Sequence, residues 1–297
     1  MARVDGPGAA PGDAAKVVSR IGVEEARERF GPELERRLHA AVAGDGVLFV
    51  AARYHLDTGG KRLRALLPPW ICNNLGGDPT NALALGVAFE LVHNGTLVHD
   101  DLQDGDTHRR GLPTVWARFG MPQAVNVGTA LLLLGLAEVL KTPAGPRLIA
   151  DVNLAVLGIV EGQALEFELH TAAEPTPAAW ERMARGKTGD LFGACFLGGA
   201  RAAGLGDADS DAIAELGREL GVFFQLQDDL LDLVGDKGRE LPATDLAEGK
   251  ISWPVAWAKQ HAAAPQSDRL MAIVRAPRGD TTAAMVEEAL ALLHATG

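Results

Sequence analysis

Apolar residues recur three and four positions apart along most of this chain, which is the spacing that places side chains on one face of an α-helix. Together with capping residues, this spacing predicts helices over Val23–Ala43, Thr80–Asp104, Pro122–Lys141, Arg147–His170, Thr176–Gly204, Ser210–Val234, Ile251–Gln260, Ser267–Val274 and Thr281–Ala295. No stretch of useful length alternates apolar and polar residues as a half-buried strand does. The sequence therefore predicts an all-α fold of roughly ten helices, in a single domain that spans residues 18–297.

Two segments differ from ordinary amphipathic helices. The predicted helix Pro122–Lys141 is apolar around most of its circumference, so we expect it to be buried on all sides, in the core or at a subunit interface. Its longest apolar run is interrupted by Glu138, short of the ~20 consecutive apolar residues of a membrane span, so we expect no span. Residues 1–17 are rich in Gly, Ala and Pro, without the apolar centre of a signal peptide, and are expected to form a disordered tail.

The composition is that of a globular protein, with 47% hydrophobic and 23% charged residues. The chain has 28 basic and 39 acidic residues, a net charge of −11, which argues against a nucleic-acid-binding protein because such proteins carry a basic stripe. A polyanionic substrate would have to be held by metal ions and a local cluster of cations. Cys72 and Cys195 both lie in apolar segments, which is typical of reduced core thiols in a cytoplasmic protein.

Two short acidic motifs each contain two adjacent aspartates and a third one three positions later. They are LVHDDLQD, with Asp100, Asp101 and Asp104, and FQLQDDLLD, with Asp228, Asp229 and Asp232. On a helix these carboxylates gather on one edge within about one turn, where their mutual repulsion favours a compensating cation. Oxygen ligands in this number suit Mg²⁺, which takes its other ligands from water and phosphate. A single motif could be a solvated helix face, but both copies are flanked by Val, Leu or Phe.

Basic residues lie after the first acidic motif and in a glycine-containing segment upstream. Arg109 and Arg110 follow the motif, and paired guanidinium groups suit phosphate because each offers a planar fork of donors. The same pair could instead satisfy the dipole of a helix C-terminus. The segment GGKRLR places Lys61, Arg62 and Arg64 beside a glycine pair. It is either a solvated helix start or an anion site where backbone amides and cations converge.

Further polar residues interrupt apolar helices or open them. These are His93, Lys187, Thr188, Gln225 and Lys250. A lone histidine on an apolar helix is more often a core residue than a ligand, whereas a lysine there requires an anion partner. Gln225 lies one turn before the second acidic motif, and Lys250 opens a helix whose N-terminus could bind phosphate. Gln163 lies in the segment EGQALEFE, where the glutamates are compatible with a solvated acidic face.

No motif of nucleophilic catalysis is present in the sequence, neither Gly-x-Ser-x-Gly nor a Walker loop nor His-Glu-x-x-His. Two metal clusters, a ring of cations and apolar helices favour a different reaction. In that reaction metal ions assist the loss of a diphosphate and apolar walls shelter a carbocation.

Six ordered segments resemble the motifs of the trans-isoprenyl diphosphate synthases (polyprenyl synthetases). They are GGKRLR, LVHDDLQDGDTHRRG, GQALE, KTGDLF, FQLQDDLLDLVGD and DLAEGK, between about residues 55 and 258. The resemblance implies an all-α prenyl-synthase (isoprenoid synthase) bundle around a central cavity, and a homodimer. It also implies a head-to-tail condensation of isopentenyl diphosphate with an allylic diphosphate (dimethylallyl, geranyl or farnesyl), assisted by three Mg²⁺ ions.

The resemblance further implies a role for each matching residue. The metal ligands would be Asp100, Asp101, Asp104, Asp228, Asp229 and Asp232, and the catalytic residues Asp100, Asp101, Asp228 and Lys187. The allylic diphosphate would be bound by Arg109, Lys187, Thr188, Gln225 and Lys250. Isopentenyl diphosphate would be bound by Gly60, Lys61, Arg64, His93 and Arg110.

Two other functions share parts of this pattern. A terpene cyclase pairs one aspartate-rich motif with an Asn/Ser/Glu metal motif, which this sequence lacks. A non-catalytic subunit would keep the fold. Two departures support that alternative: Thr129 replaces an aspartate usual in the family, and the segment after the second motif is shortened to GRELPATD, with Glu240 near the place of a usual lysine. All six aspartates and the basic residues persist, which favours an enzyme.

Three residues before the first motif bear on product length. Thr96 and Gly95 lie four and five positions before Asp100, where bulky residues stop elongation early in the family, so their small size predicts no stop at C15. Phe89 lies eleven positions before Asp100, about 20° from the same helix face and roughly 16 Å deeper. It would close the path after three to four isoprene units, or be ordinary core. We expect a C20 product, with C25 or longer as the alternative.

Overall fold

The computed structural model describes residues 20–234, 243–277 and 279–296, so the tail expected over residues 1–17 lies outside the described residues. The helices are α1 (Val23–Ala41), α2 (Val47–Asp57), α3 (Leu63–Asn74), α4 (Leu83–Gln103), α5 (Val115–Phe119), α6 (Met121–Val139), α7 (Gly145–Thr171), α8 (Pro177–Ala184), α9 (Asp190–Ala202), α10 (Asp207–Val234), α11 (Thr244–Ala247), α12 (Trp253–His261), α13 (Ala264–Val274) and α14 (Ala283–Thr296). A 3₁₀ turn, η1 (Pro79–Ala82), leads into α4. The expected all-α fold is confirmed.

Apart from the segment 176–204, each helix that the periodicity predicts is present as one helix, with bounds that differ by a few residues. Helices α2, α3, α5 and α11 were not predicted individually, and α5 and α11, with five and four residues, are too short for an apolar face to repeat. A short hairpin accompanies the helices. Strands β1 (His108–Arg109) and β2 (Leu112–Pro113) pair antiparallel, and two residues are too short to show a period.

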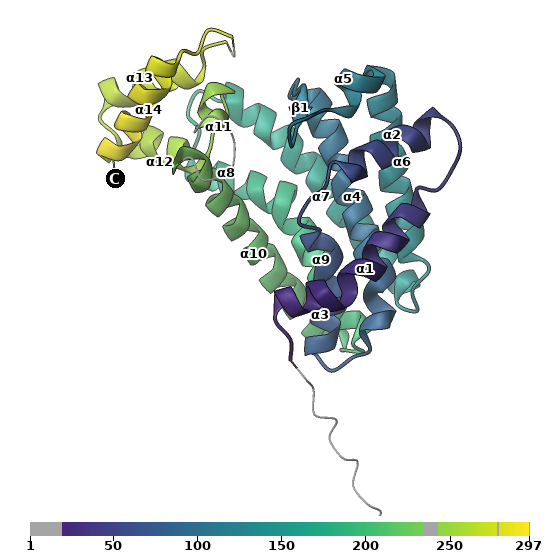
Figure 1. The fold of residues 1–297 in the computed structure, drawn as a ribbon. Helices are drawn as coiled ribbons and strands as arrows, with labels where there is room; N and C mark the ends of the chain where they lie inside the picture. The colour runs from purple at the N-terminus through teal and green to yellow at the C-terminus, as the bar shows by residue number, and fades with distance from the viewer. Residues whose placement is uncertain (1–19, 235–242, 278, 297) are drawn as a thin grey trace, which may run out of the picture.

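Among the described residues, buried side chains form three clusters along the bundle. The N-terminal cluster, around Leu34 and Leu131, joins α1, α2, α4 and α6. The central cluster, around Phe89 and Phe196, joins α3, α4, α7 and α9, and the partly buried Trp70 packs against both. The C-terminal cluster, around Trp180, joins α8 and α11 to α14, which Figure 1 shows grouped at one end of the molecule. Polar groups can therefore converge where the clusters adjoin.

Helices α6 and α7 stand out among the described helices by combining length with a long apolar stretch. Both are long and apolar enough to cross a membrane by length and composition alone, with 39% of each apolar window buried. The search for an uninterrupted apolar run in the sequence did not detect these two helices. Of the two placements expected for α6, the core or a subunit interface, burial in the core of a single chain is not observed. Leu133 on α6 and Leu154 on α7 remain 62% and 66% exposed, which leaves the subunit-interface alternative.

The segment predicted as one helix over residues 176–204 is interrupted by a π-helical turn at Arg185–Gly189, between α8 and α9. The backbone of α7 lies directly against this turn. A Cβ added at Gly162 would lie 2.7 Å from Cα of Lys187, and one added at Gly186 would lie 2.7 Å from the carbonyl oxygen of Gly158. Glycines on both elements therefore permit the close approach, and the irregular turn places Lys187 beside α7.

We expect Gly162→Ala to destabilise the protein by about 1–3 kcal/mol, because the added methyl group would displace backbone rather than a flexible side chain. Thermal unfolding measures the loss. The control is Gly206→Ala, where an added Cβ meets no atom within 4 Å and a change within about 0.5 kcal/mol is expected. Equal melting temperatures for the two variants would contradict the close contact between α7 and the π turn.

Candidate active site

The first acidic motif ends α4, and its aspartates do not all lie on one edge. Asp100 and Asp104 are partly exposed and lie one turn apart, whereas Asp101 is 1% exposed and bonds Arg109 at 2.6 Å. Burial raises the pKa of Asp100 to about 6, although Lys187 opposes the shift, and burial also raises the pKa of Asp104. The expected gathering of three carboxylates on one edge therefore holds for two of them.

A tight hairpin after α4 positions the two arginines, instead of the helix end that was considered from the sequence. Arg109 in β1 pairs with Leu112 in β2, and the two residues between them, Arg110 and Gly111, have φ angles of 54° and 77°. This pair of positive φ values matches a two-residue hairpin turn. The turn directs Arg110 to the α2–α3 loop, where it donates to the carbonyl oxygen of Gly59.

The second acidic motif lies on α10. Asp228 lines a cavity of about 120 Å³ together with Lys187, Lys250 and Gln225. Asp229 lines the same cavity and accepts hydrogen bonds from the Gln225 amide and the Trp253 backbone, both at 3.0 Å. The cavity therefore collects the first two aspartates of the second motif and three of the five residues expected to bind an allylic diphosphate.

The third aspartate of this motif, Asp232, is 2% exposed and bonds residues at the start of α11. Its carboxylate accepts from the Thr244 hydroxyl at 2.7 Å and from the Asp245 amide at 2.9 Å. These bonds fix the first turn of α11. The predicted metal-ligand role of Asp232 stays a prediction, and the contacts indicate a structural role beside it.

Two lysines connect the two acidic motifs. Lys187 pairs with Glu166 of α7, and burial tends to lower its pKa, but Glu166 and the nearby Asp100 and Asp104 outweigh this effect and raise it. Lys250 lies 3.7 Å from Asp104 and 3.0 Å from Glu248, and its pKa is likewise raised by surrounding acids against the effect of burial. Both lysines are therefore charged and lie between the motifs.

The structure also adds residues that the sequence argument did not single out. Glu166, treated as a solvated glutamate, lines the cavity and pairs with Lys187. Gln163, one turn earlier on α7, is buried, and its amide nitrogen and oxygen have no hydrogen-bond partner. The spacing of Gln163 and Glu166 could have indicated their common role, because residues three positions apart lie on the same side of α7. Thr188 donates to Gln225 at 2.9 Å, which joins two further predicted residues.

The carboxylates fit a divalent cation. Oδ2 of Asp101 is buried without a hydrogen-bond partner, and the raised pKa of Asp100 reports an unfavourable buried charge that a cation would relieve. The donors are oxygens, as Mg²⁺ prefers. In the described part of the chain no three Asp, Glu, His or Cys side chains form a ready-made metal cluster, so the ligand roles of the six aspartates stay predictions.

A second basic cluster lies beside the hairpin. The Arg64 guanidinium lies 3.3 Å from Nε2 of His93, and a Cβ at Gly60 would lie 3.0 Å from the Arg110 guanidinium. Burial, then the neighbouring arginines, lower the pKa of His93 well below its ordinary value. His93 is therefore neutral, and the arginines supply the positive charge. Four of the five residues expected to bind isopentenyl diphosphate thus lie in two adjoining contacts.

His55 of α2 is a further member of this cluster that the sequence argument missed. It is 2% exposed and its Nε2 has no hydrogen-bond partner. Burial lowers its pKa to about 3, with further effects of Arg109 and Arg110.

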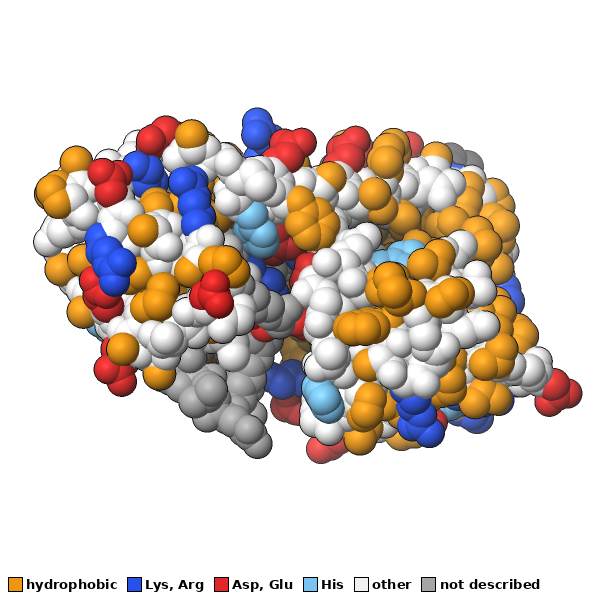
Figure 2. All heavy atoms as spheres, turned by 90° about the horizontal axis from the view of Figure 1, so that it is seen from above, with side chains coloured by type: hydrophobic (Ala, Val, Ile, Leu, Met, Phe, Trp, Pro, Cys, Tyr) orange, Lys and Arg blue, Asp and Glu red, His pale blue; other side chains and the backbone are white. Residues whose placement is uncertain are grey.

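Viewed from above, the molecule is hollowed between the C-terminal helices and the rest of the bundle, and charged side chains lie within the hollow (Figure 2).

Comparisons with known proteins agree with this arrangement. The sequence model of the polyprenyl synthetase family matches residues 46–293. The geranylgeranyl diphosphate synthase of Mycobacterium tuberculosis is 35% identical over 309 residues, which cover 98% of this chain and 85% of that protein. A crystal structure of a geranylgeranyl pyrophosphate synthetase from Pyrococcus horikoshii Ot3 superimposes with a TM-score of 0.84 at 30% identity, covering 92% of this chain and 86% of that one.

A crystal structure of a polyprenyl synthase from Caulobacter crescentus CB15, complexed with calcium and isoprenyl diphosphate, is also similar. It has a TM-score of 0.81 at 27% identity and covers 94% of this chain and 86% of that one. Other similar proteins are a farnesyl diphosphate synthase of Mycobacterium bovis (36% identical over 68% of this chain and 57% of that one) and a decaprenyl diphosphate synthase of Rhodobacter capsulatus (TM-score 0.83, 26% identical over 93% and 85%). These names differ in product length, so similarity leaves that length open.

The fold is that of the prenyl synthases, and the protein is a prenyltransferase. The chain belongs to the polyprenyl synthetase family, whose metal-dependent members elongate trans-prenyl diphosphates from isopentenyl diphosphate and allylic diphosphates. Because this is a family of soluble enzymes, α6 and α7 are best understood as bundle helices. The resemblance found from the motifs is therefore confirmed at the level of family, fold and type of reaction.

Proposed function

We propose that this protein catalyses the Mg²⁺-dependent head-to-tail condensation of isopentenyl diphosphate with an allylic diphosphate, which is dimethylallyl, geranyl or farnesyl diphosphate. One observation carries the proposal. The cavity that contains Asp228 also contains Lys187 and Lys250, and Lys250 reaches Asp104 of the first motif. A separate arginine cluster lies beside it. The arrangement supports two diphosphate subsites of different composition.

The allylic diphosphate would bind at the first subsite, where Lys187, Lys250 and Arg109 offset its charge and Thr188 and Gln225 orient it. Isopentenyl diphosphate would bind at Gly60, Lys61, Arg64, Arg110 and His93. The allylic carbon–oxygen bond breaks, the double bond of isopentenyl diphosphate attacks the cationic carbon, and a proton is lost from the new unit. The apolar helix walls exclude water from the cation.

The six aspartates of the two motifs would hold the Mg²⁺ ions, of which the family resemblance implies three. When bound, these ions stabilise the charge of the departing diphosphate. The protein's own contribution is to keep Asp100 and Asp104 beside Lys187 and Lys250 at a place where burial already disfavours unpaired carboxylates.

The test is release of diphosphate by the purified protein with Mg²⁺, isopentenyl diphosphate and each of the three allylic diphosphates. Elongation requires both substrates and gives a longer prenyl diphosphate. A terpene cyclase would release diphosphate from the allylic substrate alone, and a non-catalytic subunit would release none. Either of these results would overturn the proposal.

For the product we propose C20, with C25 or longer as the alternative. Thr96 and Asp100 lie on the partly exposed face of α4, and Phe89 further along is 0% exposed. Phe89 packs against α9, because a Cβ at Gly198 would lie 3.2 Å from its ring. Gly95 lies on another side of α4, where a Cβ would be 2.9 Å from the carbonyl oxygen of Gly128. The placement supports Phe89 as the end wall.

We expect Phe89→Ala to shift the main product to a longer chain, because the truncated side chain would open the space between α4 and α9 at the end of the tail path. Chromatography of the dephosphorylated products measures the shift. The matched control is Phe30→Ala, a buried phenylalanine of the N-terminal cluster, which should lower stability and leave the product unchanged. Thr96→Phe is expected to give C15 or shorter products, because Thr96 lies on the partly exposed face of α4 with Asp100. An unaltered product in both Phe89→Ala and Thr96→Phe would show that the tail follows another wall.

We further propose that the protein is a single-domain cytoplasmic homodimer. Exposed apolar residues follow the helical spacing on α6 and α7, among them Val125, Leu133, Leu154, Leu157 and Val160. A second copy of the chain would cover this face, which is the subunit-interface alternative for α6. Figure 2 also shows hydrophobic side chains gathered on the side of the molecule where α5 and α6 lie. Sedimentation of the purified protein measures the assembly state.

A further inference from the structure

The loop between α2 and α3 carries the residues assigned to isopentenyl diphosphate, and its backbone has an unusual conformation. Gly59 and Gly60 have φ angles of 91° and 141°, and Arg62 has a φ of 50°. Glycine adopts such angles freely, but a residue with a side chain loses on the order of 1–2 kcal/mol. A conformation of this kind persists only where surrounding contacts enforce it.

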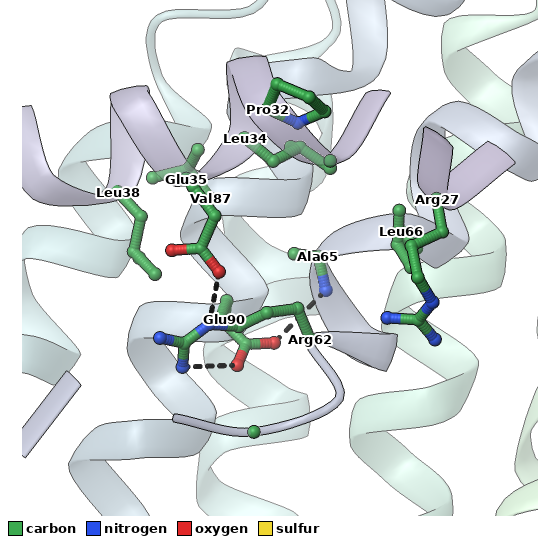
Figure 3. Close-up of a pocket in the computed structure, with 12 residues that line it drawn as sticks. Arg27, Pro32, Leu34, Glu35, Leu38, Arg62, Ala65, Leu66, Val87 and Glu90 are labelled. Carbon is green, nitrogen blue, oxygen red and sulfur yellow. Dashed lines mark hydrogen bonds and ion pairs between the residues drawn. The ribbon is translucent and has the colours of Figure 1, made fainter. Parts of the chain in front are cut away.

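The side chain of Arg62 supplies these contacts. Its guanidinium donates to the carbonyl oxygen of Leu56 at 2.7 Å and to Glu35 of α1 at 2.8 Å, and it lies 3.5 Å from Glu90 of α4. Figure 3 shows the guanidinium between the two carboxylates. A single side chain thereby ties the loop to the end of α2 and to two other helices.

Glu90 extends the connection to the first turn of α3. It is 4% exposed, and its second oxygen accepts from the backbone N–H of Ala65 at 3.2 Å. This N–H is one of those that a helix start leaves without an internal partner. Asn94 also donates to Glu90 at 3.2 Å. Because Arg64 precedes Ala65, the same carboxylate that holds Arg62 also fixes the turn that carries Arg64.

Arg62 and Glu90 face a space other than the substrate subsites. Both line a cavity of about 380 Å³ that is bounded by apolar residues of α1 and α4 (Figure 3). Of the five residues assigned to isopentenyl diphosphate, Gly60 alone lines that cavity, and its lining shares no residue with the cavity of Lys187 and Asp228. The pair therefore acts on the substrate through the loop and not by contact.

We infer that Arg62 and Glu90 are positioning residues for the isopentenyl diphosphate subsite, whose ion pair holds Gly60, Lys61 and Arg64 in the conformation that binds the diphosphate. The inference rests on the proposed function, since it assigns a role within that subsite. When the ion pair is broken, the binding groups are still present, but their positions relative to the diphosphate change. The effect should fall on one substrate and spare the other.

The experiment compares Arg62→Gln, Glu90→Gln and the double variant with the wild-type enzyme. Each single variant should raise the KM for isopentenyl diphosphate about tenfold or more, with the KM for the allylic diphosphate within twofold. The double variant should be no worse than the more affected single variant, because the two side chains act as one unit. The matched control is Glu138→Gln, which removes the charge of another buried glutamate, paired with Lys141 at the end of α6, and should leave both KM values unchanged.

A fourth variant separates the side chain from the backbone. Arg62→Gly keeps the positive φ without strain and removes every guanidinium contact, so it should also raise the KM for isopentenyl diphosphate. A wild-type KM in this variant, or equal changes in both KM values in the single variants, would overturn the inference. If the wild-type enzyme forms no product, the proposed function fails instead. Calorimetric binding of isopentenyl diphosphate to the same variants then decides the inference, and unweakened binding would overturn it.

Discussion

Asp228→Ala should reduce turnover by a factor of about 10² to 10³ or more, which is the effect of removing a group that stabilises developing charge. Asp228 lines the cavity between the two lysines, and its loss would remove a ligand for the ions that assist departure of the diphosphate. Asp100→Ala is expected to have an effect of the same size. Because burial raises the pKa of Asp100 to about 6, its removal also relieves a disfavoured charge, so folding should not suffer.

Turnover with saturating substrates and Mg²⁺ measures the effect, and circular dichroism checks that the helix content is unchanged. The control is Asp211→Ala, another aspartate of α10, whose side chain is 69% exposed and lies 3.9 Å from Arg201. It should retain wild-type turnover. Near wild-type turnover in both Asp100→Ala and Asp228→Ala would show that the two acidic motifs do not act as proposed.

The second large effect is expected from Lys187→Ala, which should raise the KM for the allylic diphosphate by more than tenfold and the KM for isopentenyl diphosphate far less. The lysine is held between Glu166, Asp100 and Asp104, so its charge acts in one subsite. Arg64→Ala should show the reverse pattern, because Arg64 lies beside His93 in the other subsite. Steady-state kinetics with each substrate varied in turn measures both values.

Removing Lys187 also leaves Glu166, whose side chain is only 15% exposed, without its cation, which costs stability. Lys187→Ala/Glu166→Gln should recover the melting temperature and not the KM for the allylic substrate. The control for loss of a lysine is Lys259→Ala, whose partners Glu174 and Asp268 are 75% and 76% exposed, so that no buried acid is left without its cation. Equal changes for the two substrates in Lys187→Ala would rule out the partition of the site.

The residues of the site could be predicted from the sequence because they recur in short motifs on long periodic helices. Asp100 and Lys187 illustrate this, since each interrupts an apolar helix where a charge needs a partner. Their neighbours could not be predicted in the same way. The pairing of Asp101 with Arg109 depends on a hairpin of two-residue strands, which has no periodic signal.

Contacts between helices that are far apart along the chain could not be predicted from the sequence either. Gly95 was expected beside the prenyl tail because its spacing from Asp100 is close to one turn, yet its missing side chain makes room for α6. Glu166 was grouped with solvated glutamates because the sequence does not show that α7 approaches the π turn. A helical period identifies which residues share a face, but packing decides what that face meets.

The π-helical turn at Arg185–Gly189 has a consequence for the protein as a whole. A π-helical turn contains one residue more than the matching α-helical turn, and this extra residue changes the rotational phase of the helix by about 100°. Before the turn, Trp180 and Met183 belong to the C-terminal cluster; after it, Phe192 and Cys195 belong to the central cluster. Deleting one residue of the turn would restore a regular helix locally and rotate one of these pairs out of its cluster. The length of this short segment is therefore more tightly constrained than its side chains, because it sets the rotational register between the C-terminal and central clusters.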